Sequence, residues 1–135
     1  MTAVSSDIGV TRIGQIAFTV ADVPRAVAFY RDVLGLRFLF EAPPNLAFFD
    51  CGGTRLMLED RSILDEVHGL RNDSVIYFRV AGIHPAYEEL RGRGVEFTDA
   101  PHVVGTHPDG TQEWMAFFKD CDGKLLAIMA QAKPA

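Results

Sequence analysis

The spacing of apolar residues changes from one segment of the chain to the next. Residues 13–20 (IGQIAFTV) alternate apolar and polar side chains, a period of two that predicts a β-strand. Residues 23–34 instead place apolar side chains three or four positions apart, which predicts an amphipathic helix. Asp22 and Pro24 are typical helix-start residues, and Gly35 is a typical helix stop. The chain is therefore predicted to open with a strand and a helix.

Three short β-rich segments follow this helix. They predict strands at 36–41, 46–50 and 55–59. Pro43-Pro44 and Gly52-Gly53 separate these segments, and both dipeptides are typical of turns. The first part of the chain is thus predicted to form one βαβββ module.

The same order of segments occurs a second time. Residues 15–22 (QIAFTVAD) are similar to 75–82 (VIYFRVAG), and 47–58 (AFFDCGGTRLML) are similar to 116–129 (AFFKDCDGKLLAIM). A repeat of about 60–70 residues that occurs only twice is too long for a solenoid and fits two tandem modules. The second copy is predicted to hold a strand at 75–80, a helix at about 84–93, and strands near 95–97, 114–118 and 124–129.

The length of 135 residues suits one domain. We expect a single α+β domain over residues 12–130. Its parts are module 1 at 12–59, a linker at 60–73, module 2 at 74–130, and flexible tails at 1–11 and 131–135.

Strand alternation gives the predicted sheet two different faces, because successive side chains point to opposite sides. One face is wholly apolar and should be covered by the helices; it comprises Ile16, Phe18, Val20, Leu56, Leu58, Ile76, Phe78, Val80, Leu126 and Ile128. The other face mixes polar, aromatic and charged residues, namely Gln15, Ala17, Thr19, Arg55, Met57, Glu59, Val75, Tyr77, Arg79, Leu125, Ala127 and Met129. Such a mixture is typical of a small-molecule site. The alternative is a partly solvated face that binds nothing.

Three segments together resemble a known superfamily. They are 14–36 (GQIAFTVADVPRAVAFYRDVLGL), 76–97 (IYFRVAGIHPAYEELRGRGVEF) and 117–129 (FFKDCDGKLLAIM). In this order they resemble the vicinal oxygen chelate superfamily of glyoxalases, bleomycin-resistance proteins and extradiol dioxygenases. The resemblance implies two βαβββ modules that form a curved, cup-like mixed sheet with the helices outside, commonly assembled as a homodimer.

The resemblance also locates the four metal ligands of the superfamily, which fall on Gln15, Met57, Val75 and Ala127. Only glutamine is a ligand type that the family uses. Valine and alanine have no donor atom, and a thioether suits copper(I) better than harder divalent ions. We therefore expect no metal at these positions and no cofactor, unless a divalent metal binds at a relocated site.

Histidines supply a second candidate site. His102 and His107 flank the segment VVGT, and with Glu113 they are candidates for a displaced metal site or for acid/base catalysis. The alternative is a surface loop over 102–112 with two ordinary histidines. His68 in the linker and His84 near a helix start are expected to be solvated.

Tyr77 and Arg79 are two positions apart and therefore share the mixed face. Arginine suits a carboxylate or phosphate of a ligand, and tyrosine suits stacking or hydrogen bonding. Arg79 is equally suited to a structural pair with Glu59 or Glu113. The complete set of expected ligand contacts is Gln15, Arg55, Met57, Glu59, Tyr77, Arg79, Trp114 and Ala127.

Composition narrows the class of partner. Eighteen acidic residues against 13 basic ones give a net charge of −5, which argues against binding nucleic acid. No apolar run approaches the roughly 20 residues that span a bilayer. The first ten residues lack the pattern of a secretory signal, and two cysteines are too few for a disulfide scaffold. We expect a cytoplasmic protein.

The resemblance and the mixed face together favour a metal-free protein, similar to the bleomycin-resistance branch, that binds a small molecule in the cup or in a cleft at the dimer interface. A glyoxalase-like lyase or isomerase is the alternative, with a relocated metal or with metal-free acid/base chemistry. A partner protein or scaffold whose cup has lost its function is a third interpretation. The sequence leaves open whether the protein is an enzyme.

Overall fold

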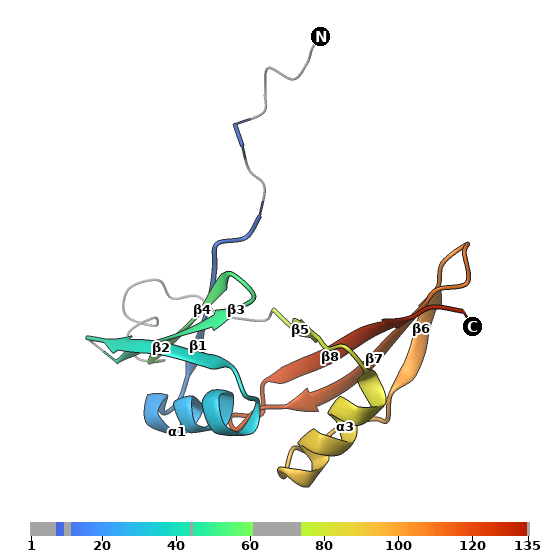
Figure 1. The fold of residues 1–135 in the computed structure, drawn as a ribbon. Helices are drawn as coiled ribbons and strands as arrows, with labels where there is room; N and C mark the ends of the chain where they lie inside the picture. The colour runs from blue at the N-terminus through green and yellow to red at the C-terminus, as the bar shows by residue number, and fades with distance from the viewer. Residues whose placement is uncertain (1–7, 10–11, 44, 61–73, 135) are drawn as a thin grey trace.

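The computed structural model describes residues 8–9, 12–43, 45–60 and 74–134 (Figure 1). The elements of module 1 are β1 (Gln15–Val20), α1 (Val23–Ala28), the π-helical turn η2 (Phe29–Val33), β2 (Arg37–Ala42), β3 (Leu46–Cys51) and β4 (Thr54–Asp60). Those of module 2 are β5 (Ile76–Arg79), α3 (Ile83–Gly92), β6 (His102–Thr106), β7 (Gln112–Lys119) and β8 (Leu125–Ala132). The strands β4 and β8 extend into the regions predicted as linker and tail.

Each module forms its own four-stranded mixed sheet. The strand orders are β1-β4-β3-β2 and β5-β8-β7-β6, so the second sheet repeats the first. In each sheet the first and last strands of the module pair in parallel, and the other pairings are antiparallel. The helices lie under one side of the two sheets (Figure 1). The predicted α+β fold of two βαβββ modules is confirmed.

The apolar face lies against the helices, as predicted. Seven of its ten predicted residues are buried in the core: Phe18, Val20, Leu56, Leu58, Phe78, Leu126 and Ile128. The other three, Ile16, Ile76 and Val80, are half-buried and pack against it. The helices contribute buried side chains to the same core, among them Val23, Val27, Tyr30, Ile83 and Leu90. Burial of this apolar surface is the main term that favours folding.

The first helix begins at the predicted residue, ends at Val33, one residue before the predicted end, and has two parts. Asp22 caps it, because its carboxylate accepts a hydrogen bond of 3.1 Å from the backbone N–H of Arg25. Gly35 follows it in the left-handed conformation, with φ of +81°. Between them, the N–H of Leu34 donates to the carbonyl of Phe29, five residues back. The apolar stripe predicts a helix here but not its hydrogen-bond register, since both registers keep the stripe on the buried side.

Two predictions in module 2 are wrong. Residues 95–97 form no strand; Phe97 makes only an isolated bridge with Phe118. The strand that pairs with β7 is β6, within the segment 102–112 that we interpreted as a possible surface loop. All five β6 residues are exposed and its register shifts between Val103 and Gly105. An exposed edge strand with a bulge lacks the alternation by which a strand is predicted.

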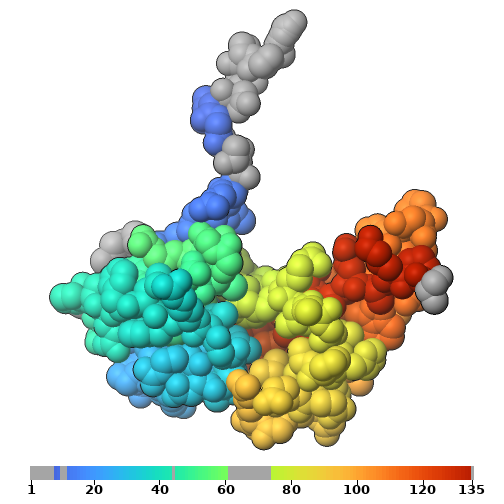
Figure 2. Space-filling model, in the orientation of Figure 1, coloured from blue at the N-terminus to red at the C-terminus, as the bar shows by residue number. Residues whose placement is uncertain are grey.

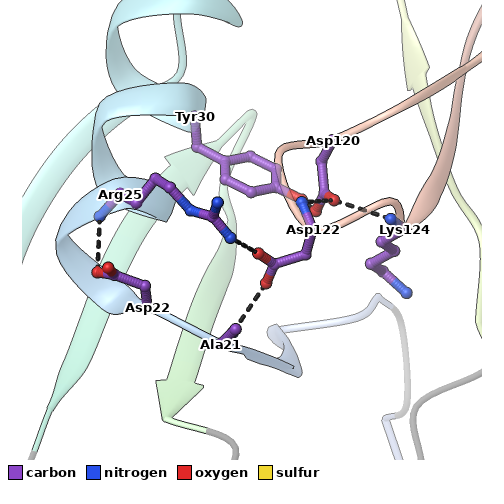
Figure 3. Close-up of polar contacts among 7 residues, drawn as sticks. All are labelled: Ala21, Asp22, Arg25, Tyr30, Asp120, Asp122 and Lys124. Carbon is purple, nitrogen blue, oxygen red and sulfur yellow. Dashed lines mark hydrogen bonds and ion pairs between the residues drawn. The ribbon is translucent and has the colours of Figure 1, made fainter.

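A polar cluster joins the two modules, and we call it the intermodule anchor (Figure 3). Asp120, in the turn between β7 and β8, accepts hydrogen bonds from the Tyr30 hydroxyl at 2.7 Å and from the backbone N–H of Lys124 at 2.9 Å. Asp122 accepts from the backbone N–H of Ala21 at 2.8 Å and pairs with the Arg25 guanidinium at 2.5 Å. The turn of module 2 is thereby bonded to the start and middle of the first helical segment.

The phenol of Tyr30 is fully buried. Burial, followed by the charge of Asp120, raises the pKa of Tyr30 far above its ordinary value. The hydroxyl therefore stays protonated and remains a donor to the carboxylate. Without this donor, one buried oxygen of Asp120 has no side-chain partner.

We expect Tyr30→Phe to lower the free energy of unfolding by about 1–3 kcal/mol, because a buried carboxylate oxygen loses its donor. Urea denaturation followed by circular dichroism measures this loss. Tyr87→Phe is the matched control, since Tyr87 packs edge-on against Phe97 and its hydroxyl has no hydrogen bond within the described ranges. Equal losses in the two variants would contradict a specific role for the anchor.

Candidate functional site on the cup face

The sheet surface turned away from the helices is the candidate site, and we call it the cup face. In Figure 2 the lobe of module 1 and the lobe of module 2 rise on either side of a hollow beside β5. By strand register, the cup face of the first sheet presents Gln15, Ala17, Thr19, Leu46, Phe48, Asp50, Arg55, Met57 and Glu59. That of the second presents Tyr77, Arg79, Glu113, Met115, Phe117, Lys119, Leu125, Ala127, Met129 and Gln131.

In module 1, the amide of Gln15 is held by its neighbours. Its Oε1 accepts a hydrogen bond of 2.7 Å from Arg55 Nε, and its Nε2 lies 3.8 Å from Met57 Sδ. The Arg55 guanidinium also lies 5.0 Å from the centroid of the Phe48 ring, a cation–π arrangement. Phe48 in turn stacks on Phe40, with centroids 4.7 Å apart. These five side chains form one connected polar and aromatic surface.

Phe40 is a cup-face residue that the sequence pattern did not identify. Strict alternation places Phe38 and Phe40 on the same side of β2. The register shift between them pairs Phe38 with the core residue Phe49 and Phe40 with the cup-face residue Phe48. Phe40 is 46% exposed as a result. The bulge therefore adds an aromatic ring to the cup face that no period-2 pattern could predict.

In module 2, two aromatic rings cover Ala127. Tyr77 and Phe117 lie on the strands to either side of it, and their rings meet edge to face with centroids 5.7 Å apart. Ala127 is completely buried beneath them, whereas Tyr77 is 43% exposed. The ring of Tyr77 is therefore accessible to a ligand. The methyl group of Ala127 supplies no polar group to one.

Arg79 is exposed on the same strand, two residues beyond Tyr77. Among the described residues it forms no ion pair, so the structural pair with Glu59 or Glu113 is not made. Its charge still contributes to lowering the pKa of Glu113. The guanidinium donors of Arg79 are thus available to a ligand.

Trp114 lies on the opposite side of the sheet from the cup face. It pairs in register with the core residue Ala130 and packs against the core, with its ring 5.0 Å from the ring of His84. The structure therefore does not bring Trp114 together with the other expected ligand residues of the cup face. Phe117, three residues later, takes the cup side of β7.

The structure brings together two of the three predicted acid/base residues. His107 Nε2 lies 2.7 Å from Glu113 Oε2, and Gln131 Nε2 donates to the same oxygen at 2.5 Å. The other oxygen, Glu113 Oε1, is buried and has no partner in the described structure. His102 instead lies beside Asp99 and the carbonyl of Ala100.

Across the described ranges, no three histidine, cysteine, aspartate or glutamate side chains are grouped so that they could hold a metal ion. His84 is exposed, and His68 lies outside the described residues. The two cysteines are free thiols. Burial raises the pKa of Cys51 and, together with Asp122 and Asp120, raises that of Cys121 to about 11. Neither is therefore suited to act as a thiolate nucleophile.

A pocket of about 190 Å³ lies where β5 meets β1 and β4, and we call it the seam pocket. Its lining comprises Ile13, Ile16, Cys51, Thr54, Arg55, Leu56, Ile76, Tyr77, Phe78 and Arg79. Most of these side chains are apolar, but Arg55, Tyr77 and Arg79 belong to the cup face. The pocket thus connects the predicted ligand residues of the two modules.

The structure thus consists of two βαβββ modules that share a cup face, which is the class of protein that the sequence predicts. The model of the Glyoxalase/Bleomycin resistance protein/Dioxygenase superfamily matches residues 12–128, and the chain belongs to this superfamily. The protein YraH of Bacillus subtilis (strain 168), which is uncharacterized, is 30% identical over 127 residues that span 84% of this chain and 94% of YraH.

Solved structures support the fold. A glyoxalase/bleomycin resistance protein/dioxygenase from Nocardioides matches with a TM-score of 0.69 and 24% identity, covering 96% of this chain and 91% of its own. A lactoylglutathione lyase from Agrobacterium tumefaciens matches with a TM-score of 0.73 and 22% identity, covering 90% of this chain and 95% of its own. Identities this low establish a shared fold and leave the activity open.

The helices described in the structure are all too short or too polar to cross a membrane.

The pair of His107 and Glu113 predicts a pH effect on stability. Hydrogen bonds from His107 and then Gln131 hold the pKa of Glu113 below its ordinary value of 4.5. The ionised carboxylate therefore stabilises the fold above about pH 4.5, and this contribution is lost as the pH falls through the lowered pKa. We expect the difference in melting temperature between wild type and Glu113→Gln to shrink from pH 5 downward.

Thermal denaturation between pH 5 and pH 3 measures this difference. Glu88→Gln, at an exposed glutamate of α3, is the matched control and should follow the wild type more closely. A Glu113→Gln curve parallel to the wild type over this range would show that the pair does not stabilise the fold.

Proposed function

We propose that this protein binds a small molecule on the cup face without the help of a metal ion. The observation that carries the proposal is the set of side chains at the four metal positions of the superfamily, Gln15, Met57, Val75 and Ala127, beside aromatic rings and free arginine donors.

These four side chains do not fit the metal. A hard divalent ion needs nitrogen or oxygen donors, and four positions here offer one amide oxygen and one thioether. The amide oxygen of Gln15 already accepts a hydrogen bond from Arg55, and its nitrogen faces Met57. Ala127 is buried beneath Tyr77 and Phe117. Chemistry that depends on a chelated metal is therefore not proposed for this face.

The same surface supplies what a metal-free binding site needs. Aromatic rings at Phe40, Phe48, Tyr77 and Phe117 provide stacking and apolar burial, and Arg55 provides directed donors. Proteins of this superfamily commonly bind small molecules and are often dimers. A bleomycin-resistance-like mode, in the cup or in a cleft completed by a second copy, is our proposal for this chain. The homodimer and the cytoplasmic location stay predictions.

The pair of His107 and Glu113 favours a second candidate function. A histidine hydrogen-bonded at 2.7 Å to a carboxylate that Gln131 orients is an arrangement suited to proton transfer. It supports a glyoxalase-like lyase or isomerase that uses acid/base chemistry. His102 has no place in this pair, because its ring faces Asp99 and Ala100.

Binding to the native state raises the melting temperature by mass action. We expect at least one compound to do so in a panel of aromatic molecules with one or two rings, in anionic, neutral and cationic forms. Tyr77→Ala should weaken the binding of that compound about tenfold, since it removes an exposed stacking ring. Isothermal titration calorimetry measures the affinity.

Tyr87→Ala is the control for this substitution, because Tyr87 lies on α3 and not on the cup face. It should lower stability without changing the affinity. The proposal fails if no compound of the panel binds, or if Tyr77→Ala leaves every affinity unchanged.

Elemental analysis tests the absence of a metal. We expect protein purified without chelator to carry no stoichiometric nickel, zinc, manganese or iron, because the four family positions supply too few hard donors. A metal lost in Gln15→Ala would place a metal at the family positions and overturn the proposal. A metal lost instead in His107→Ala, together with a turnover that disappears, would favour the second candidate.

A further inference from the structure

We infer that the seam pocket takes a small aromatic monoanion, a single ring that carries one carboxylate. The inference deepens the proposed function, on which it rests, by naming the chemical class of the ligand and its position between the modules. Three observations carry it: the size of the pocket, its apolar walls and the charges at its rim.

The size limits the ligand to about one ring. The seam pocket holds about 190 Å³. An apolar cavity of about 150 Å³ in another protein accommodates benzene, whereas drug-sized ligands fill pockets of about 300–1,000 Å³. One six-membered ring fits within the pocket, and little volume remains for a second ring.

The walls suit an aromatic body. Ile16, Leu56, Ile76 and Phe78 line the pocket from both modules, and all four belong to the apolar side of their strands. Contacts between a ring and such side chains are non-directional and favour apolar surface of any kind. Tyr77, also in the lining, adds an exposed ring that can meet the ligand edge to face.

The charges decide the sign of the ligand. Arg55 and Arg79 both line the pocket, and no aspartate or glutamate is among the lining residues described. The Nε of Arg55 donates a hydrogen bond to the neutral amide of Gln15, which leaves the two terminal nitrogens of the guanidinium for another acceptor. Arg79 has no carboxylate within ion-pair distance among the described side chains. Asp50 faces Arg55 in register from β3, but it does not line the pocket, its Oδ1 accepts a hydrogen bond from the N–H of Gly53, and it makes no ion pair with Arg55 within the described residues. Two guanidinium groups without an ion-pair partner attract a carboxylate, to which arginine can donate two parallel hydrogen bonds.

This local charge is opposite to that of the whole chain. The net charge of the chain is −5, and this charge alone would favour a cationic ligand. At the seam pocket the sign is reversed, and a cation there faces two like charges. Benzoate, benzyl alcohol and benzylamine therefore discriminate the inference, because they share one ring and differ mainly in charge.

Isothermal titration calorimetry with these three compounds tests the inference on the full chain at low salt. We expect benzoate to bind at least tenfold more tightly than benzyl alcohol, and benzylamine not to bind measurably. Arg79→Gln should weaken benzoate binding about tenfold and leave benzyl alcohol binding unchanged. Arg91→Gln, at an exposed arginine of α3 that does not line the pocket, removes the same charge and should leave both affinities unchanged.

Backbone amide NMR shifts locate the ligand and should be largest in β5 and in residues 54–56. The inference is overturned if benzyl alcohol or benzylamine binds as tightly as benzoate. It is also overturned if Arg79→Gln leaves the affinity for benzoate unchanged, or if the amide shifts occur only in strands other than these. If these three compounds fail while a larger panel compound binds in a Tyr77-dependent manner, the inference falls and the proposed function stands. If nothing binds, both fall.

Discussion

The hydrogen bond between the buried Tyr30 hydroxyl and Asp120 is the contact on which the arrangement of the two modules depends. In the described structure the two sheets share no strand pairing, so backbone hydrogen bonds of a continuous sheet do not set their relative position. The shared hydrophobic core and the intermodule anchor do so instead, with Asp122 bonded to Arg25 and to the N–H of Ala21 (Figure 3). A second contact reinforces it, from Arg93 Nη1 to the carbonyl of Val33 at 2.9 Å. The seam pocket lies between the modules that this core and these contacts join.

The anchor also explains which residues carry the family resemblance. Tyr30 lies in the run FYRDVLGL, and Asp120 and Asp122 form the later D-x-D-G turn. These segments are far apart in the chain and meet at 2.7 Å in the fold. The anchor residues within these motifs are therefore structural, and they say nothing about the chemistry of the cup face. The family can therefore be identified from its fold-forming residues, independently of the side chains on the cup face.

Comparison of the two modules shows where side chains are free to differ. Core-facing positions correspond closely, as with Phe18 and Phe78 or Leu56 and Leu126, because each must fill space under a helix. Several cup-facing positions differ in kind, as with Ala17 and Tyr77 or Thr19 and Arg79, whereas Phe48 corresponds to Phe117. The exposed positions of that face are less constrained by packing than the core, and the two modules carry different polar and aromatic groups there. The seam pocket combines an arginine from each.

The period-2 pattern predicted the sheet faces correctly wherever the strands are regular. It failed at two bulges, because one extra residue moves every later side chain to the other face. The first bulge turns Phe40 toward the cup, and the second lies in β6, which was interpreted as a possible loop. Distances such as that between His107 and Glu113 depend on the same hairpin geometry and have no signature in the sequence. The local sequence therefore predicts which side chains face the core in regular strands. Which side chains meet at the site depends also on bulges, and these become visible only when the strands are paired.

Net charge and site charge diverge here for a physical reason. Many of the acidic side chains in the described structure serve local backbone geometry: Asp22 caps α1, Asp99 accepts from the N–H of Phe117, and Asp109 accepts from that of Thr111. Asp120 and Asp122 are committed to the anchor. Carboxylates used in this way sit at turns and helix starts, where free N–H groups need acceptors. The cup face also carries Asp50, Glu59 and Glu113, of which Glu113 is bonded to His107 and Gln131. None of these three lines the seam pocket, whereas Arg55 and Arg79 do, so an acidic chain can present a cationic pocket.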